Sequence, residues 1–175
     1  MSFTIRPAIA QDADAVCGVL RRSISECCEA DHRSDPAVLA AWLGNKTPQT
    51  VTSWFESPTN VSLVALRDNT VVGVALLTGA GKLALCYLLP DVLRQGAGKA
   101  LLAEMEARAV ALGMKTMFLH STLTAEGFFA AHGYRRDGNV RAPYGIDTVL
   151  FWKPLVEHAA APDSQRKRFC NCNSA

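Results

Sequence analysis

Leu93-Arg94-Gln95-Gly96-Ala97-Gly98-Lys99-Ala100 is the stretch that decides the fold, because it places two glycines between a predicted strand and a predicted helix. Upstream, residues 83–89 form a continuous apolar run closed by Pro90, which is short enough for a buried strand. Downstream, apolar residues recur at helical spacing over residues 101–112, and Gly113 supplies a C-terminal stop. The sequence therefore predicts a strand, a glycine loop and a helix in this order.

A glycine loop at the start of a helix favours the binding of an anion. Glycines let the backbone come close to a ligand, and the N–H groups of the first helical turn, aided by the helix dipole, favour a phosphate there. Arg94 and Lys99 add positive charge on either side of the glycines. We therefore expect this loop to bind a phosphate group.

Two common phosphate loops do not match this stretch. A Walker A loop requires a glycine at the position of Leu93 and a Ser or Thr at the position of Ala100. The dinucleotide fingerprint requires a third glycine where Leu101 stands, in a longer βαβ context.

The remaining pattern resembles the pyrophosphate loop of the GCN5-related N-acetyltransferases, the GNAT superfamily. That pattern is Gln or Arg, two variable residues, Gly, one variable residue, then Gly or Ala. Here it runs from Leu93 to Gly98, with Gly96 in place and Gln95 as the polar residue often seen before the first glycine. Leu93 departs from the leading Gln or Arg, and Arg94 is one place away.

A second block is similar to the other GNAT signature. Residues 115–120 predict a strand, and residues 125–134 predict a short helix that ends at Gly133. The block contains an Ala, the aromatic pair Phe128 and Phe129, then Gly133 and Tyr134. The resemblance covers roughly residues 3 to 155.

The rest of the chain follows the same order of elements. We expect a strand at 3–6, a helix at 12–25, helical residues at 36–55, a hairpin of 62–67 and 71–77 turned at Asp68-Asn69, and a strand at 148–153. The resemblance implies an α/β (α+β) fold with a mixed, mostly antiparallel sheet, splayed between its fourth and fifth strands and flanked by helices. We predict one domain over residues 1–157 and a disordered tail over 158–175.

Composition sets limits on this protein. A chain of 175 residues with 49% hydrophobic content can bury one core, and a net charge of +2 is too small to indicate a nucleic-acid partner. No apolar stretch is long enough to span a bilayer, and the N-terminus opens without a signal sequence, so we expect a cytoplasmic protein with no membrane partner. The six cysteines form no C-x-x-C pair, so we predict free thiols and no metal site. A homodimer is left open.

The resemblance implies acetyl-coenzyme A as co-substrate. Its pyrophosphate would lie on the glycine loop and its pantetheine arm beside the strand that precedes the loop. The implied cofactor-binding residues are Leu88, Leu89, Arg94, Gln95, Gly96, Ala97, Gly98, Lys99 and Phe129.

The implied chemistry is direct attack of a primary amine on the thioester in a ternary complex, which needs a route for the amine's proton and an acid for the leaving thiolate. Phe129 stands where many members have a tyrosine acid, and residues 83–89 contain no acidic residue. His120 and Tyr144 are the candidate substitutes, with Tyr87 as a further acid. For His120, a structural role at a strand end is the alternative.

The acceptor, a small-molecule or peptide amine, is expected at an acidic segment after the first helix. Glu26, Glu29, Asp31 and His32 are the predicted substrate-binding residues, although such a cluster is also typical of a solvated helix end. Two functions stay open: an N-acetyltransferase, and a non-catalytic acyl-coenzyme A-binding module that has lost the usual acid and base. A loop that binds another nucleotide is a third alternative.

Overall fold

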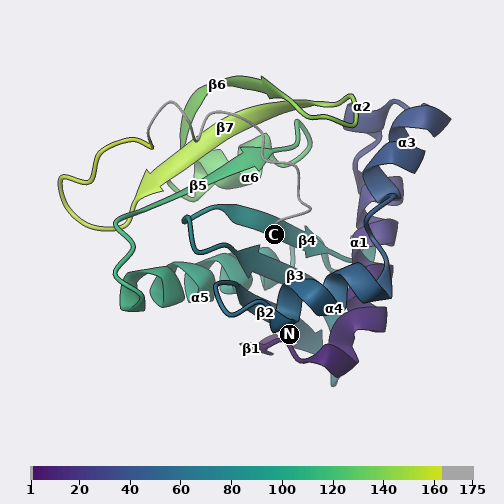
Figure 1. Cartoon of the computed structure of the whole chain (residues 1–175), viewed down its shortest axis with the longest axis horizontal. Helices are drawn as coiled ribbons and strands as arrows, with labels where there is room; N and C mark the ends of the chain where they lie inside the picture. The colour runs from purple at the N-terminus through teal and green to yellow at the C-terminus, as the bar shows by residue number, and fades with distance from the viewer. Residues whose placement is uncertain (1, 163–175) are drawn as a thin grey trace.

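The computed structural model describes residues 2–162 and contains two antiparallel sheets with helices around them (Figure 1). The first sheet has the order β1-β2-β3-β4. Its strands are β1 (Thr4–Pro7), β2 (Val61–Arg67), β3 (Thr70–Leu77) and β4 (Leu83–Leu88). Asp68 and Asn69 both have positive φ, 50° and 63°, as a two-residue type I′ hairpin turn requires. The predicted hairpin is therefore confirmed.

The second sheet has the order β5-β7-β6. Its strands are β5 (Thr116–Ser121), β6 (Arg135–Arg141) and β7 (Asp147–Pro154). The sheets are joined by an isolated parallel bridge between Lys82 and Phe118, and from there β4 and β5 run apart (Figure 1). This arrangement confirms the predicted splay between the fourth and fifth strands.

Six α-helices and two 3-10 turns connect the described strands. They are η1 (Ala10–Asp12), α1 (Ala13–Cys27), α2 (Glu29–His32), α3 (Pro36–Leu43), α4 (Pro48–Glu56), η2 (Pro90–Val92), α5 (Ala97–Ala111) and α6 (Glu126–Ala131). The helical stretch expected at 36–55 is two helices. The second begins at Pro48, whose ring is suited to a first helical position, and the Thr47 side chain accepts the Thr50 N–H at 3.2 Å as its cap.

The first sheet is buried on both faces. One set of its side chains, including Val64 and Val74, packs with α1 and α4, whereas another, including Leu63 and Ala75, packs with α5. The α5 core continues to the second sheet through Phe129 on α6. Figure 1 shows α1 to α4 gathered on one side of the molecule, with α5 along the lower part of the sheet. The core thus fixes β4 and the start of α5 firmly, and both border the site.

A third, smaller cluster closes the open end of the splay. Ile24 and Cys28 of α1, Trp42 of α3, and Ala142 and Ile146 between β6 and β7 are buried together. Segments far apart in the sequence therefore meet over the ends of β4 and β5. Trp42 and Ile146 of this cluster also line a cavity.

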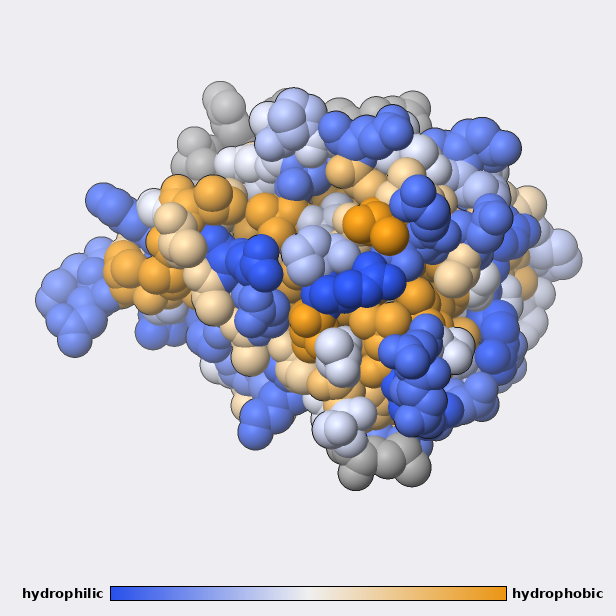
Figure 2. Space-filling view, turned by 90° about the horizontal axis from the view of Figure 1, so that it is seen from below, coloured by the Kyte–Doolittle hydropathy of each residue, from blue (hydrophilic) through white to orange (hydrophobic). Residues whose placement is uncertain are grey.

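The surface mixes residue types. Seen from below, hydrophobic residues gather in the middle of the face, with hydrophilic residues among and around them (Figure 2). No helix in the described part of the chain is long and apolar enough to cross a membrane. Residues 158–162 belong to no helix or strand, and the Thr116 hydroxyl donates to the Ala160 carbonyl at 3.1 Å. The remainder of the predicted tail, with Cys170 and Cys172, lies outside the described residues.

Candidate functional site: two neighbouring cavities

The glycine loop forms the start of α5 as the sequence predicts. Gly96 is the N-cap at φ 98°, with no side-chain cap, and the first helical bond runs from Ala100 N–H to the Gly96 carbonyl at 3.0 Å. The N–H groups of Ala97, Gly98 and Lys99 therefore lie in the first turn, ahead of that bond, where an anion binds well. The loop has the geometry of an anion cradle.

Gly98 is held close to two neighbouring side chains. A Cβ at this position would lie 3.3 Å from Leu88 Cδ1 and from the ring of Phe128. The backbone of the cradle consequently touches the end of β4 on one side and α6 on the other. A small residue here keeps the space in front of the loop open.

A cavity of about 650 Å³ lies in front of this loop. Its walls come from the end of α1, β4, the η2–α5 loop and α6. The lining residues are Ser23, Cys27, Cys28, Cys86, Tyr87, Leu88, Leu93, Arg94, Gly96, Gly98, Lys99, Thr122, Thr124, Ala125, Gly127, Phe128 and His132. We call it the cofactor cavity.

Five of the predicted cofactor-binding residues line this cavity: Leu88, Arg94, Gly96, Gly98 and Lys99. The other four do not line it. Ala97 is buried, the Gln95 amide donates to the Asp91 carbonyl at 2.9 Å, and Leu89 N–H donates to the Val72 carbonyl at 2.8 Å. Phe129 is 5% exposed and packs against Tyr134 and Phe151 in the core.

Several residues of the cofactor cavity are not among the cofactor-binding residues predicted from the sequence. Phe128 lines it instead of its neighbour Phe129, and the ring of His132 lies against Phe128 at 4.4 Å. Cys28 and Cys86 also line it, and burial raises the pKa of each thiol to about 12. These cysteines are therefore neutral, apolar wall residues at physiological pH.

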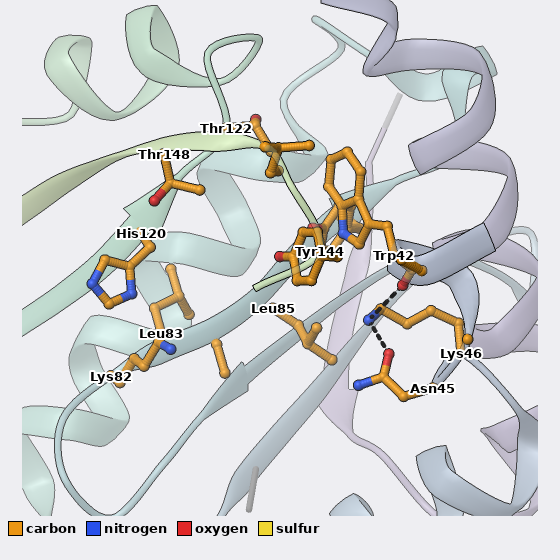
Figure 3. A pocket seen from close by; sticks show the side chains of 15 residues that line it. Trp42, Asn45, Lys46, Lys82, Leu83, Leu85, His120, Thr122, Tyr144 and Thr148 are labelled. Atoms are coloured by element: carbon orange, nitrogen blue, oxygen red, sulfur yellow. Dashed lines mark hydrogen bonds between the residues drawn. The ribbon is translucent and has the colours of Figure 1, made fainter. Parts of the chain in front are cut away.

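A second cavity, of about 210 Å³, lies between side chains of β4, β5 and α3 (Figure 3). It is lined by Ala41, Trp42, Gly44, Asn45, Lys46, Lys82, Leu83, Ala84, Leu85, Tyr87, His120, Thr122, Tyr144, Ile146 and Thr148. We call it the acceptor cavity. Tyr87 and Thr122 line both cavities, so the two spaces are neighbours near the ends of β4 and β5.

Both predicted catalytic residues lie in the acceptor cavity. Tyr144 stacks on Trp42, with ring centroids 5.5 Å apart and planes 14° apart. Burial and the positive charge of Lys82 lower the pKa of His120 to about 4. At neutral pH the imidazole of His120 is therefore uncharged, and it is a weak base for an ammonium group.

The charged side chains of the acceptor cavity are basic. Lys46 and Lys82 are 5% and 7% exposed, and Lys46 Nζ donates to the Trp42 carbonyl at 3.4 Å. Within the described part of the chain, no Asp or Glu lines this cavity. In Figure 3, Lys82 lies beside His120 at one end and Lys46 beside Trp42 at the other.

The four predicted substrate-binding residues, Glu26, Glu29, Asp31 and His32, line neither cavity. Glu26 pairs with Arg22 at 2.9 Å, Glu29 accepts the Ser34 hydroxyl at 3.4 Å, and His32 Nδ1 accepts Ser34 N–H at 3.0 Å. Asp31 accepts Leu123 N–H at 2.6 Å and the Thr124 hydroxyl at 2.5 Å. Asp31 thus holds the loop after β5, next to Thr122.

Comparison with known proteins gives one family. The family described as acetyltransferase (GNAT) domain matches residues 29–153. The chain is 39% identical over 82 residues to an amino-acid acetyltransferase of Azotobacter vinelandii, and 33% identical over 104 residues to one of Pseudomonas putida. The matched segments cover 44% and 53% of this chain but 19% and 24% of those relatives, so this chain corresponds to a minor part of their length.

Solved structures share the fold. A GCN5-related N-acetyltransferase from Rhodopseudomonas palustris superposes with a TM-score of 0.77 at 21% identity, covering 88% of this chain and 96% of that one. The PaiA N-acetyltransferase of Thermoplasma acidophilum, in complex with coenzyme A, gives 0.75 at 20% identity, covering 88% and 99%. A phosphinothricin acetyltransferase of Sinorhizobium meliloti, in complex with acetyl-coenzyme A, gives 0.71 at 24% identity, covering 94% and 95%.

Proposed function

We propose that this chain, which belongs to the GNAT acetyltransferase family, transfers the acetyl group of acetyl-coenzyme A directly to a primary amine in a ternary complex. The observation that carries the proposal is that two neighbouring cavities share Tyr87 and Thr122 as lining residues. One cavity contains the anion cradle, and the other is smaller. Two substrates entering from opposite sides of the splay would meet at this junction without a covalent enzyme intermediate.

The cofactor cavity fits coenzyme A on its own geometry. The first-turn N–H groups of α5 and the charges of Arg94 and Lys99 suit a pyrophosphate. The strand β4 is the edge of its sheet on the side of the splay, so its outer backbone groups are placed to pair with an extended amide arm. Two of the similar solved structures hold coenzyme A or acetyl-coenzyme A.

The chain's own groups must manage two protons. Bound acetyl-coenzyme A supplies an activated thioester carbonyl. We assign Tyr87 as the acid for the leaving thiolate, because it lines both cavities, whereas Phe129 has no proton to donate and lies in the core. We assign His120 to orienting the amine by a hydrogen bond, because an imidazole with a pKa of about 4 is too weak a base to hold the proton. The ammonium therefore loses its first proton to water before attack, and the second N–H proton, released as the C–S bond breaks, restores the proton that Tyr87 gives to the thiolate.

The test is acceptor-dependent release of free coenzyme A from acetyl-coenzyme A, with a panel of amines. We expect Tyr87→Phe to lower kcat about 100-fold, the lower end of the usual effect of general acid catalysis, with the affinity for acetyl-coenzyme A unchanged. Tyr144→Phe is the matched comparison, since Tyr144 lines only the acceptor cavity and should keep most of the rate. If Tyr144→Phe loses this much kcat and Tyr87→Phe does not, the acid is Tyr144.

Tight binding of acetyl-coenzyme A without release by any amine would contradict catalysis. It would favour the alternative, a non-catalytic acyl-coenzyme A-binding module, which the Phe at position 129 and the Leu at position 93 also suit. Stabilisation by ATP or NAD but not by acetyl-coenzyme A would instead remove the cofactor assignment itself.

A further inference from the structure

Two aromatic rings lie together in the wall of the cofactor cavity. Phe128 of α6 and His132, the C-cap of α6, both line this cavity, and their ring centroids are 4.4 Å apart. We propose that the adenine of coenzyme A stacks on His132, which Phe128 supports from behind, and that this contact makes the chain select thioesters of coenzyme A over thioesters of phosphopantetheine, which carry no nucleotide. The assignment rests on the proposed function, because it takes coenzyme A to be the ligand of the cavity.

The order of residues along the cavity places the nucleotide at His132. Coenzyme A is a linear molecule, with the thioester at one end, then the pantetheine arm, the pyrophosphate and the adenosine. Its thioester end belongs at Tyr87 and Thr122, the residues shared with the acceptor cavity. The ring of Phe128 lies 3.3 Å from the place of a Cβ on Gly98, so the glycine loop that suits the pyrophosphate is level with Phe128. His132 is one helical turn further along α6 from Thr122, where the part of the ligand beyond the pyrophosphate would lie.

The imidazole of His132 is held in place before any ligand binds. Its Nδ1 lies 2.7 Å from the Phe128 carbonyl oxygen, and because a carbonyl can only accept, Nδ1 carries the proton and donates it. Phe128 is itself supported by Phe129 of the core, edge to face, with ring centroids 5.1 Å apart. His132 is only half-buried, so the part of its ring that Phe128 does not cover is accessible to a flat ligand. A ring fixed in this way loses little rotamer freedom when a base stacks on it.

The surroundings of His132 suit a base better than a phosphate. Aromatic side chains stack on nucleic-acid bases because both present flat π-faces. His132 stands at the C-terminal end of α6, where the helix carbonyl groups point and an anion is disfavoured. The basic residues Arg94 and Lys99 come from the glycine loop, and among the described residues α6 adds no Lys or Arg to the lining. The phosphates therefore belong to the glycine loop, and the base belongs to the rings.

The experiment is calorimetric titration of the whole chain with three ligands. They are coenzyme A, dephospho-coenzyme A, which lacks the 3′-phosphate, and 4′-phosphopantetheine, which lacks the nucleotide. His132→Asn should weaken the affinity for the first two ligands by about tenfold, the effect of losing one base–aromatic stack, and change that for 4′-phosphopantetheine by less than about twofold. Asparagine keeps a side-chain N–H for the Phe128 carbonyl, so the loss reports on the ring and not on this hydrogen bond.

Two further variants serve as controls. His132→Phe keeps a ring and should bind all three ligands within about threefold of the wild type. His158→Asn, at an exposed histidine that lines neither cavity, is the matched control and should change none of the three affinities. In the transfer assay, the preference in kcat/KM for acetyl-coenzyme A over acetyl-phosphopantetheine should shrink about tenfold in His132→Asn alone.

The three ligands separate the alternatives. An affinity loss confined to coenzyme A means that His132 contacts the 3′-phosphate, and an equal loss for all three ligands means that it only shapes the glycine loop; either result overturns the stacking. Wild-type affinities in His132→Asn, or an equal loss in His132→Phe, overturn it as well. The expected pattern of binding without acetyl transfer to any amine supports the stacking and contradicts the proposed catalysis. A wild-type chain that binds none of the three ligands overturns both.

Discussion

The cofactor cavity and the acceptor cavity are built by different means. The cofactor cavity is organised by one continuous stretch, the loop around Gly96 and Gly98, and its main chemistry is that of backbone N–H groups. The acceptor cavity is assembled from separate segments, with Lys46, Lys82 and His120 all more than 30 positions apart in the sequence. Its chemistry is that of side chains held together by the core.

This difference explains why one cavity identifies a family and the other does not. Backbone groups at a helix start need only a few glycines and a fixed turn, which leave a short, recognisable pattern. A side-chain site depends on which loops the fold brings together, so the same fold serves many acceptors. Substitutions confined to one cavity therefore test how independent the two cavities are.

The largest effect is expected for Asp31→Ala. This buried carboxylate accepts Leu123 N–H at 2.6 Å and the Thr124 hydroxyl at 2.5 Å, beside the shared residue Thr122. Loss of these charge-assisted bonds should lower the free energy of unfolding by about 4 kcal/mol, measured by urea denaturation. Glu29→Ala, at an exposed position two residues earlier, should change it by less than about 0.5 kcal/mol. A stable Asp31→Ala protein with a selectively raised acceptor KM would restore Asp31 as a substrate ligand.

The second effect is a pH dependence of stability. In the unfolded chain His120 has its ordinary pKa of 6.5, whereas in the fold its pKa is about 4. Between these values the unfolded state binds the extra proton, so the stability gained from the neutral ring is complete above pH 6.5 and is lost as the pH falls to 4. The difference between the two pKa values of His120 corresponds to about 3 kcal/mol in the free energy of unfolding.

His120→Asn removes this titrating group. Between pH 7.5 and 4.5, the wild type should therefore lose about 2–3 kcal/mol more stability than the variant, measured by urea denaturation at each pH. Asp12, whose pKa the hydrogen bond from Arg6 lowers, adds acid sensitivity to both proteins alike and cancels in the difference. Parallel pH curves for the two proteins would show that His120 is hydrated in the fold.

The third prediction concerns the cofactor cavity alone. Gly98→Asp should weaken the affinity for acetyl-coenzyme A at least about 100-fold by calorimetry, because a carboxylate then faces the pyrophosphate, an effect of about 2.7 kcal/mol. The fold should persist, since an acidic residue in the first turn stabilises a helix and the new Cβ meets flexible side chains at 3.3 Å. Gly98→Asn introduces a neutral side chain of the same size and should lose much less affinity for acetyl-coenzyme A. Unchanged affinity in Gly98→Asp would mean that the cradle lies elsewhere.

The sequence predicted most of what depends on local pattern. The hairpin turn at Asp68-Asn69, the strand before Pro90 and the helix after Gly96 are all present, and the splayed sheet is confirmed. The aromatic pair shows where prediction from local pattern ends. Adjacent helical residues point about 100° apart, so only one of Phe128 and Phe129 can face the core, and the local pattern does not say which. Only the packing against Tyr134 and Phe151 selects Phe129.

The lining of the acceptor cavity could not be predicted from local sequence patterns, for a related reason. An acidic run such as residues 26–35 is visible in the sequence, but its partners, including the N–H of Leu123, are set by the tertiary fold. Buried lysines such as Lys46 and Lys82 have no sequence signal, since most lysines are exposed. The charge of an enclosed cavity is therefore a property that the structure reveals.

The smallest effect separates charge from backbone strain within the glycine loop. Arg94 has φ 60°, a left-handed conformation that costs a non-glycine residue roughly 1–2 kcal/mol. Arg94→Gly removes this strain but adds entropy to the unfolded chain, so the free energy of unfolding should rise by only about 0.5–1 kcal/mol. The same substitution removes a positive charge and should weaken the binding of acetyl-coenzyme A by up to about tenfold. Arg94→Asn should reproduce the loss of affinity with a smaller gain in stability, because asparagine tolerates this conformation but is neutral. If both variants bind acetyl-coenzyme A as the wild type does, backbone N–H groups alone make the cradle, and the contrast with the side-chain-built acceptor cavity becomes sharper.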